Sequence, residues 1–535
     1  MSDRGALRRV LVRGVLGASL VTVFPGTAAA QSPRVWWRDA VCYEVFVRSF
    51  YDSDGDGIGD LRGLTARLDY INDGNPASKK SLGAKCIWLM PIAKAKSYHG
   101  YDVNDYYHVD PHYGTDDDFR ALVQAAHRRG IHVVVDFVPN HSSIDHPFFQ
   151  AALKDPASQY RSWYRFSSSD PKQPGPWGQV AWHKSPLRDE YYYGVFWHEM
   201  PDLNYQNPGV VREMMNVTRH WLTAMHADGL RFDAIPYLVE EGDVLMHSRG
   251  THDLLRRFGS GIHEVAPHSF TIGEESDVNA LPSYYPDQLD SYFEFGVAAG
   301  LLESARTGDA GAFIREITRA NALPYGRWAP FLSNHDQTRV MTALSGDAAK
   351  ARVAASAMLM LPGTPFVYYG EEIGMTGDKP DERIRTPMQW SGSSTGGFST
   401  TAPWEALQTD WVTTNVELQD RDRRSLLNHY RKLIHLRNAH PALSHGGMTI
   451  GSTSDARTAA FIRRAGAETI LVVVNFAAVP ISNLAVKTSE SLSGPLETIH
   501  ADPASCGKVK GRSNAAVVGI VPGNGACVLR VRGLK

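Results

Sequence analysis

Four short segments with acidic and amide side chains each close a run of β-forming residues. They are residues 136–141 (DFVPNH), 229–234 (GLRFDA), 271–276 (TIGEES) and 331–336 (FLSNHD). In a parallel barrel the carboxyl ends of all strands share one rim, so Asp233, Glu274 and Asp336 are expected to converge on one pocket. Two or three carboxylates beside an arginine and two histidines suit the cleavage of a glycosidic bond.

Asp233 and Glu274 fit the two roles that this cleavage needs. Retaining hydrolysis uses two carboxyl groups about 5 Å apart, one as the nucleophile and one as the acid and base. Asp233 follows Arg231 by two residues, so on a strand both side chains point to the same side. The guanidinium then keeps the aspartate ionised. Glu274 follows a glycine, which leaves space near the reacting centre, and glutamate has the longer reach that proton transfer requires.

Each segment also has a purely structural interpretation. Arg231 and Asp233 alone would form a buried ion pair, residues 334–336 a helix N-cap, and His141 a hydrogen-bonded core histidine. The recurrence of such residues at four strand ends favours chemistry over these alternatives.

The elements that must position these residues alternate along the chain. Apolar runs typical of buried parallel strands lie at 41–47, 86–90, 132–138, 229–232, 270–273, 291–295, 329–332 and 365–369. Helical patterns such as 116–129 and 210–226 lie between them. Eight strands with intervening helices predict a (β/α)8 barrel, which is an α/β fold.

Two regions depart from this alternation. Residues 141–208 are rich in Trp, Tyr, Pro, Ser and Asp, and their length predicts a small domain inserted after the third strand. Beyond about residue 443, short strands at 458–463, 469–474, 515–521 and 527–531 predict a terminal antiparallel β domain. The expected organisation is a barrel in two parts (31–140 and 209–442), an insertion (141–208) and a β domain (443–535).

Residues 1–30 are expected to be a signal peptide that is cleaved near Ala30. Arginines at positions 4, 8, 9 and 13 precede a short apolar run at 15–24 and small residues at 26–30. This run is shorter than the stretch of about 20 residues that spans a bilayer. A disordered or anchored N-terminus is the alternative, and Arg8 with Arg9 hints at twin-arginine export. The mature protein is therefore expected to be secreted or periplasmic, without a membrane segment.

Composition and cysteine usage narrow the class of protein. The chain has 535 residues, of which 43% are hydrophobic and 21% charged, which excludes a mainly disordered protein. A net charge of -2 gives no support for nucleic acid as a partner. The four cysteines fit an oxidising compartment. Cys506 and Cys527 are expected to pair, whereas Cys42 and Cys86 either form a bridge or are small buried side chains.

The four segments resemble the signature regions of the α-amylase family of glycoside hydrolases, over nearly all of the mature chain. This resemblance implies that Asp233 is the nucleophile, Glu274 the acid and base, and Asp336 the aspartate that binds the distorted sugar ring. The companions of the −1 sugar site match Tyr101, His141, Arg231 and His335. The family's B domain after strand three and its C-terminal β-sandwich match the insertion and the terminal domain.

Further motifs resemble particular branches of the family. Residues 200–204 (MPDLN) are similar to its fifth signature region, between the forms of oligo-1,6-glucosidases and neopullulanases. Residues 99–107 and 385–390 resemble oligo-1,6-glucosidases and trehalose synthases, where the residues matching Asp102 and Arg385 hold the terminal glucose hydroxyls. Ala234 is small, as in members that act on α-1,4 bonds. The mixture resembles the intermediary α-amylases, which hydrolyse α-1,4-glucans and often transfer glucosyl units.

Residues 52–60 (DSDGDGIGD) are expected to bind a metal ion. Aspartates at positions 1, 3, 5 and 9 of this loop offer hard oxygen ligands at a spacing that suits Ca²⁺, and glycines permit a tight wrap. The family carries a similar site in its first β→α loop. The predicted ligands are Asp52, Asp54, Asp56, Asp60 and the carbonyl of Ile58. The alternative is a solvated acidic turn. The distal glutamate of an EF-hand is missing, so a structural calcium is expected rather than a sensor.

The leading hypothesis is a secreted, monomeric, retaining α-glucan hydrolase. It would cleave α-1,4 bonds of starch, maltodextrins or maltooligosaccharides through a covalent glucosyl-enzyme intermediate, with possible transfer to sugars. An exo-acting α-glucosidase is the alternative that Asp102 and Arg385 support. A trehalose synthase is opposed by the export signal, and a non-catalytic relative by the intact carboxylates. The tryptophans of the insertion, such as Trp177, are expected mostly to pack locally.

Overall fold

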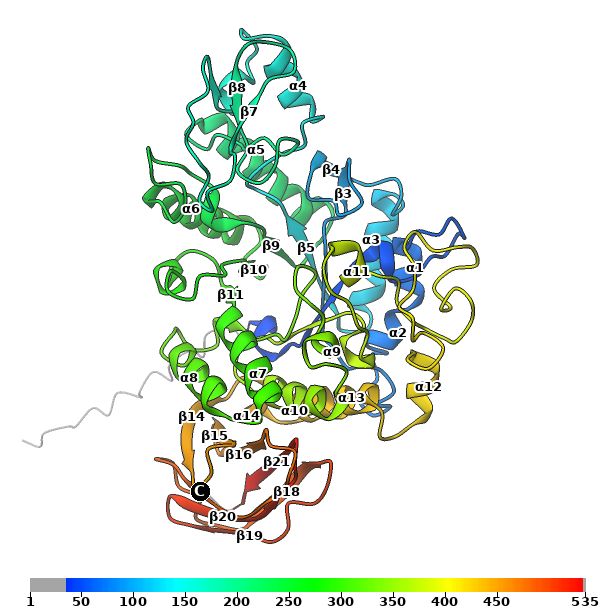
Figure 1. Ribbon diagram of the computed structural model, residues 1–535, viewed down its shortest axis with the longest axis vertical. Coiled ribbons are helices and arrows are strands. Elements are labelled where there is room, and N and C mark those ends of the chain that lie inside the picture. Colours follow the sequence, from blue (N-terminus) through cyan, green and yellow to red (C-terminus); the bar gives the residue numbers. More distant parts are fainter. Residues whose placement is uncertain (1–34, 533–535) are drawn as a thin grey trace, which may run out of the picture. The chain divides into compact units, whose positions relative to one another are not determined.

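Eight parallel strands build the barrel at the centre of the computed structural model, which describes residues 35–532 (Figure 1). They are β1 Cys42–Val45, β2 Cys86–Leu89, β5 His132–Phe137, β9 Gly229–Phe232, β10 Phe270–Gly273, β11 Ser291–Phe293, β12 Trp328–Ala329 and β13 Phe366–Tyr368. The ladders run in the order β12-β11-β10-β9-β5-β2-β1-β13. The Phe366 N–H donates to the Pro330 carbonyl at 2.9 Å and joins the two ends of this order. The predicted fold class is confirmed.

The barrel strands are buried on both faces, which explains their near-continuous apolar sequences. Every residue of β1, β2, β9 and β10 is buried. Three charged residues interrupt this pattern, namely Glu44 on β1, Asp136 on β5 and Arg231 on β9. A buried charge needs a partner, so these three positions mark where the barrel has a function beyond packing.

Helices follow the strands, and most of them cover the outside of the barrel, whereas α4 lies in the segment inserted after β5 (Figure 1). They are α1 Leu61–Ala66, α2 Leu68–Ile71, α3 Asp116–His127, α4 Pro147–Lys154, α5 Pro208–Arg219, α6 Arg249–Val265, α7 Phe295–Thr307, α8 Gly311–Ala320, α9 Val340–Ala343, α10 Ala348–Leu359, α11 Asp381–Ile384, α12 Val416–Arg421, α13 Leu426–Ala439 and α14 Pro441–Ser444. Shorter 3₁₀ turns lie at Trp36–Asp39, Val47–Ser49, Arg161–Trp163, Ile235–Tyr237, Leu281–Tyr284 and Glu371–Ile373, with a π turn at His220–Ala224.

Local signals explain where these helices begin and which face they bury. In α3 the Thr115 hydroxyl accepts from the Asp118 N–H while the Asp118 side chain accepts from the Thr115 N–H, which forms a capping box. In α6 the Ser248 hydroxyl caps the first turn, and Leu254, Phe258 and Ile262 are buried at helical spacing. The helical pattern at 210–226 becomes α5 and then the π turn.

The segment between β5 and α5 carries its own small sheet (Figure 1). Its strands are β6 Phe166–Ser167, β7 Trp182–Lys184 and β8 Tyr191–Tyr193, in the order β6-β8-β7. Stacked and edge-to-face rings hold it, including Phe149 against Tyr164 and Tyr192. A second hairpin, β3 Ala93–Ala95 with β4 Val103–Val109, follows β2 and was not predicted.

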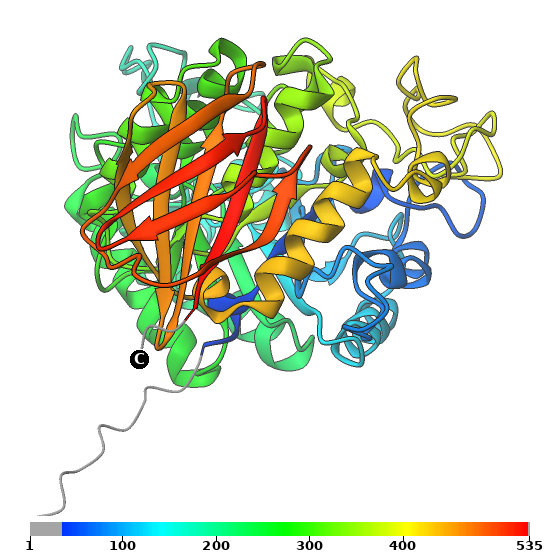
Figure 2. The same cartoon turned by 90° about the horizontal axis from the view of Figure 1, so that it is seen from below.

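The C-terminal region is an antiparallel sheet of eight strands, coloured orange to red in Figure 2. They are β14 Gly447–Thr453, β15 Thr458–Ala465, β16 Glu468–Asn475, β17 Ile481–Lys487, β18 Leu496–Asp502, β19 Val509–Arg512, β20 Ala515–Val521 and β21 Gly525–Val531. The first part of β14 pairs with β15 and its end pairs with β17, so one strand belongs to both halves. Leu471, Leu484, Val518 and Leu529 pack between the halves.

Two disulfides cross-link the described chain. Cys506 pairs with Cys527, as predicted. Cys42 pairs with Cys86 and joins β1 to β2, which decides between the two alternatives in favour of a bridge. No helix in residues 35–532 is both long and apolar enough to cross a membrane. The predicted signal peptide, residues 1–30, lies outside the described residues.

Candidate active site

A cavity of about 400 Å³ opens at the carboxyl ends of the barrel strands. Its walls come from several strand ends and from the segment inserted after β5, as expected for a barrel rim. It is lined by His99, Tyr101, His141, Trp177, Phe196, Met200, Asp233, Ala234, Pro236, Tyr237, Glu274, Ser276, Asp336, Asp381 and Arg385. Three carboxylates separated by about a hundred residues of sequence therefore share one cavity.

Arg231 lies beneath the cavity and contacts the carboxylates around it. Its Nη1 lies 2.6 Å from Asp233 Oδ1 and 3.0 Å from Asp136 Oδ1, and its Nη2 lies 2.8 Å from Glu274 Oε2. The Arg231 side chain is only 1% exposed. One guanidinium therefore holds Asp233 and Glu274 side by side, and it compensates charges that burial would otherwise disfavour.

The ends of β9 and β10 aim Asp233 and Glu274 into the cavity. The Asp233 N–H donates to the Phe137 carbonyl, and the Glu274 N–H donates to the Phe232 carbonyl, so both residues extend the strand ladders. Ala234 then turns the chain with φ 51°. A Cβ at Gly273 would lie 2.7 to 3.0 Å from neighbouring side chains, so only glycine fits before Glu274. Rigid strand ends thus fix the two carboxylates.

The surroundings of the two carboxylates raise both pKa values. Burial raises the pKa of Glu274 to about 7, and the negative charges of Asp233 and Asp336 add to this effect while Arg231 opposes it. Burial raises the pKa of Asp233 to about 6, against the effect of Arg231. Near neutral pH the glutamate holds its proton more strongly than the aspartate, as an acid beside a nucleophile must.

The environment of Asp336 lowers its pKa, in contrast to the environments of Asp233 and Glu274. His335 Nε2 lies 3.2 Å from Asp336 Oδ2, and Arg385 Nη2 lies 2.7 Å from Asp336 Oδ1. Burial alone would raise the pKa of Asp336, but these cations hold it well below its usual range. Burial would likewise lower the pKa of His335, yet Asp336 and Glu44 raise it to about 10. Asp336 is thus an ionised carboxylate, with 44% of its side chain exposed to the cavity.

A chain of hydrogen bonds connects the two sides of the site. His335 Nδ1 lies 2.6 Å from Glu44 Oε1, and His335 Nε2 lies 2.6 Å from the Tyr101 hydroxyl. That hydroxyl donates to Asp136 Oδ2 at 3.1 Å, and Asp136 binds Arg231. Glu44 and Asp136 were not predicted as site residues. An acidic residue inside an otherwise apolar strand run was the available signal.

The remaining predicted residues differ in their placement. His141 lies on the cavity wall and its Nε2 is 3.1 Å from the Tyr101 carbonyl. Asp102 is 1% exposed and absent from the cavity wall, so its assignment to substrate binding stays a prediction. Its carboxylate accepts instead from the N–H and hydroxyl of Ser97. Tyr101 lines the cavity, whereas the bend at residue 102 lies before β4 and Asp102 is not in the lining.

Aromatic side chains of the inserted segment form one wall of the cavity. Trp177 lies 5.5 Å from Phe196 and 5.1 Å from Tyr237 between ring centroids, and its side chain is 54% exposed. All three line the cavity. Trp177 therefore both packs against neighbouring rings and lines the cavity.

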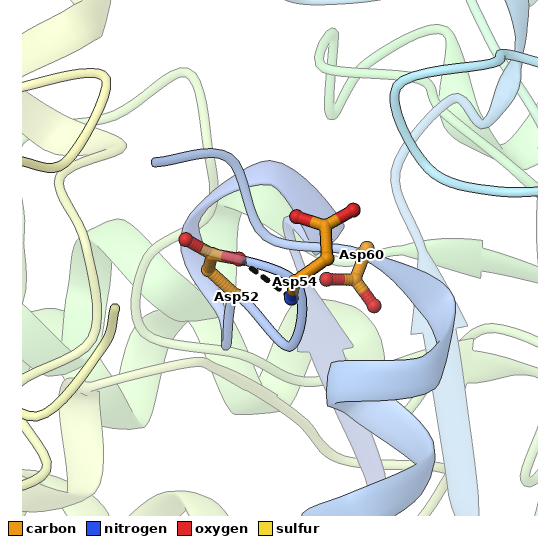
Figure 3. A group of neighbouring side chains, drawn as sticks. All are labelled: Asp52, Asp54 and Asp60. Atoms are coloured by element: carbon orange, nitrogen blue, oxygen red, sulfur yellow. Dashed lines mark hydrogen bonds between the residues drawn. The ribbon is translucent and has the colours of Figure 1, made fainter. Parts of the chain in front are cut away.

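The acidic loop between β1 and α1 gathers three of its four aspartates (Figure 3). Carboxylate oxygens of Asp52, Asp54 and Asp60 lie within 4.8 Å of one another. Asp56 is outside this group, and its Oδ1 accepts the Ile58 N–H at 2.7 Å.

This loop fits a hard cation in its donor set and its packing. In the described part of the chain no lysine or arginine pairs with these three carboxylates, and nearby Arg62 pairs with Asp118 instead. Gly57 has φ 92°, and a Cβ there would lie 2.4 Å from the Ala402 carbonyl, so the loop is wrapped tightly. Three uncompensated oxygen donors suit Ca²⁺.

Comparisons with known proteins agree with this geometry. Residues 44–446 match the family model described as alpha amylase, catalytic domain. Alpha-amylase 3 of Dictyoglomus thermophilum is 38% identical over 448 residues, which cover 82% of this chain and 85% of that protein. Trehalose synthase/amylase TreS of Mycobacterium tuberculosis strain CDC 1551 is 32% identical over 519 residues, covering 85% and 84% respectively.

A solved structure extends the match to three dimensions. The crystal structure of alpha-amylase from H. orenii superposes with a TM-score of 0.84 and 38% identity, covering 92% of this chain and all of that chain. The same family is indicated by the strand-end carboxylates, by the barrel and by the sequence matches. The chain belongs to the α-amylase family of glycoside hydrolases.

Proposed function

We propose that this enzyme is a retaining α-glucan hydrolase that cleaves α-1,4-glucosidic bonds of starch, maltodextrins or maltooligosaccharides. Asp233 would attack the anomeric carbon while Glu274 protonates the leaving oxygen, and Glu274 would then take a proton from the water that releases the sugar. Asp336, His335 and Arg385 would hold the ring hydroxyls. Atoms balance because water supplies the hydroxyl of one product and the proton of the other.

The observation that carries this proposal is the shared contact of Asp233 and Glu274 with one buried guanidinium. It places two carboxylates side by side at neighbouring strand ends. Burial raises the pKa of both, and that of Glu274 reaches about 7. Retaining glycosidases need such a pair, in which one member holds a proton while the other is ionised.

The bond and the substrate are inferred from the walls of the cavity. Ala234, directly after Asp233, is small and lines the cavity. Trp177 and Phe196 offer ring faces on which sugars stack. An exo-acting α-glucosidase is the second candidate, because Arg385 and Asp381 line the cavity beside Asp336 and form an ion pair at 2.9 Å. The similarity to TreS makes trehalose synthesis a third outcome to test.

Three measurements test the function. Proton NMR during the first minutes of maltotriose hydrolysis should show the α-anomer of the new reducing end, and the β-anomer would contradict a retaining mechanism. Asp233→Asn should remove hydrolysis and leave the fold intact. A time course on soluble starch separates the candidates. Mixed oligosaccharides from starch indicate an amylase, and glucose alone from starch indicates an exo-acting glucosidase. Trehalose formed from maltose in a separate assay indicates a synthase.

We also propose that Asp52, Asp54 and Asp60 hold a structural Ca²⁺, which would tie the loop to α1 without taking part in the chemistry. Asp60 already caps α1 by accepting the Gly63 N–H at 2.7 Å, which supports this role. The sequence of residues 1–30 and the two disulfides support export to an oxidising compartment. Recovery of a chain that begins near Gln31 from the medium or periplasm would test export.

A further inference from the structure

A second cavity, of about 950 Å³, lies at the end of the barrel opposite the active site. Lys85 and Gly130 line it, and they stand at the amino ends of β2 and β5, away from the catalytic rim. The other walls include the loop at 72–83, α13 and, on β18, Ile499 and His500. We call this space the basic cleft. Its volume is in the range that holds a small ligand.

One face of α13 forms the longest wall of the basic cleft. Asn428, Arg431, Lys432, His435 and Asn438 line it at intervals of three and four residues. The opposite face of the helix is buried, with Leu427, Tyr430, Leu433 and Ile434 in the core. Packing therefore fixes this helix and presents its polar face to the cleft.

The lining of the basic cleft is strongly cationic. Its lysines and arginines are Lys79, Lys85, Arg129, Arg423, Arg431 and Lys432, and its histidines are His435, His440 and His500. No aspartate or glutamate is among the lining residues within the described chain. Asp69 pairs with Arg129 at 2.7 Å and Asp420 with Arg431 at 2.6 Å. In the same described range, Lys79, Arg423 and Lys432 form no ion pair, so positive charge remains in excess.

Two buried nitrogen atoms in the cleft have no partner. Arg431 is 6% exposed and its Nε makes no hydrogen bond, although the residue lines the cavity. The Nε2 of His500 is also without a partner. Burial is the main cause that lowers the pKa of His500 to about 4, with a further contribution from His429, while Asp502 opposes the shift. The unsatisfied Nε–H of Arg431 calls for an acceptor.

We propose that the basic cleft binds a small ligand that carries two or more phosphate groups. Guanidinium and ammonium groups from three separate elements converge there, and these groups bind phosphate with charge-assisted hydrogen bonds. A neutral glucan is a poor fit because the lining has no Trp, Tyr or Phe ring for a sugar to stack on. Because the whole chain carries a net charge of -2, the excess is local to the cleft.

Isothermal titration with sodium tripolyphosphate and with fructose 1,6-bisphosphate tests this proposal. Both probes should bind the wild type at low ionic strength, and added salt should lower their affinity. Lys432→Glu and Arg423→Glu should each weaken binding by at least about tenfold, because each places a like charge beside the phosphates. Tighter binding of the bisphosphate would identify a phosphorylated sugar, and tighter binding of tripolyphosphate an inorganic or polymeric phosphate.

Lys510→Glu on β19 is the matched control, because it makes the same change of charge at an exposed strand position. It should change binding by less than about twofold. Unchanged starch hydrolysis will show that the cleft variants fold. Two results would overturn the proposal: no binding of either probe at about 1 mM, which corresponds to a very weak site, or equal losses in Lys510→Glu and the cleft variants.

Discussion

Two groups of three carboxylates in this protein are built in opposite ways. In the active site, Asp233, Glu274 and Asp336 are held by the fixed cations Arg231, His335 and Arg385. In the acidic loop, neutral backbone N–H and serine hydroxyl groups are the partners. Asp52 Oδ1 accepts from Gly55, and Asp52 Oδ2 accepts from Gly57, with no cationic side chain paired in the described chain.

This difference matches the different roles of the two groups of carboxylates. Built-in cations at short distance can set different pKa values for carboxylates that share one cavity, which acid and base catalysis needs. Neutral N–H donors shape the loop but leave its negative charge uncompensated, which suits a site whose cation comes from solution. A change in one group should therefore leave the other unaffected.

The largest effect is expected from removing the acid. Glu274→Gln should lower kcat on maltotriose by about 10²–10⁴-fold, the usual contribution of general acid and base catalysis. The loss should be smaller with 4-nitrophenyl α-maltoside, because its leaving group departs without protonation. Asp54→Asn, the matched change in the loop, should leave kcat unchanged. An equal loss on both substrates would contradict the role of Glu274.

Removing the cation of the active site should cost stability. Arg231→Met leaves Asp136, Asp233 and Glu274 without their buried partner. The free energy of unfolding, measured in denaturant, should therefore fall by about 3–5 kcal/mol. Arg62→Met, which removes an exposed arginine paired with Asp118, should leave the midpoint unchanged. Equal midpoints for the wild type and Arg231→Met would show that the buried carboxylates do not depend on this guanidinium.

Removing calcium should affect the loop and spare the active site. At a free concentration one hundred times its Kd, a bound ion stabilises the folded state by about 2.7 kcal/mol, so EDTA should lower the unfolding temperature. Asp52→Asn should abolish this dependence. Asp56→Asn should have less effect because Asp56 lies outside the group. If the unfolding temperature were the same with and without EDTA, the loop would be a solvated turn and not a calcium site.

The pH dependence of kcat/KM follows from the active-site group alone. The nucleophile must be ionised, so the rate should fall as pH drops below about 6, where Asp233 gains a proton. The acid must be protonated, so the rate should fall above about 7, where Glu274 loses its proton. Each limb should fall about tenfold per pH unit, with apparent pKa values that belong to the coupled pair. Asp54→Asn should leave the profile unchanged.

The sequence predicted the parts of the fold whose patterning is strongest. All eight barrel strands were found because they are continuous apolar runs. In the C-terminal sheet β14, β17, β18 and β19 were missed, since β17 and β19 are half exposed and β14 contains two glycines.

The residues of the candidate site also fall into a predicted part and a part that was not predicted. Residues directly at strand ends were predicted, whereas Glu44, Asp136 and Trp177 depend on contacts between distant segments. Asp102 was assigned to substrate binding from the resemblance of residues 99–107 to oligo-1,6-glucosidases and trehalose synthases, and the sequence alone does not show that its carboxylate accepts from Ser97.

The smallest effect on catalysis is expected at Asp102. Asp102→Asn keeps a hydrogen-bond acceptor for Ser97, so it should lower stability by about 1 kcal/mol and change KM and kcat by less than about twofold. Arg385→Gln removes a cation that binds Asp336 on the cavity wall, and it should impair kcat/KM on maltotriose much more. The comparison uses the same substrate at the same pH for both variants. A larger KM effect in Asp102→Asn than in Arg385→Gln would return Asp102 to the substrate site and require the loop at 97–102 to rearrange when sugar binds.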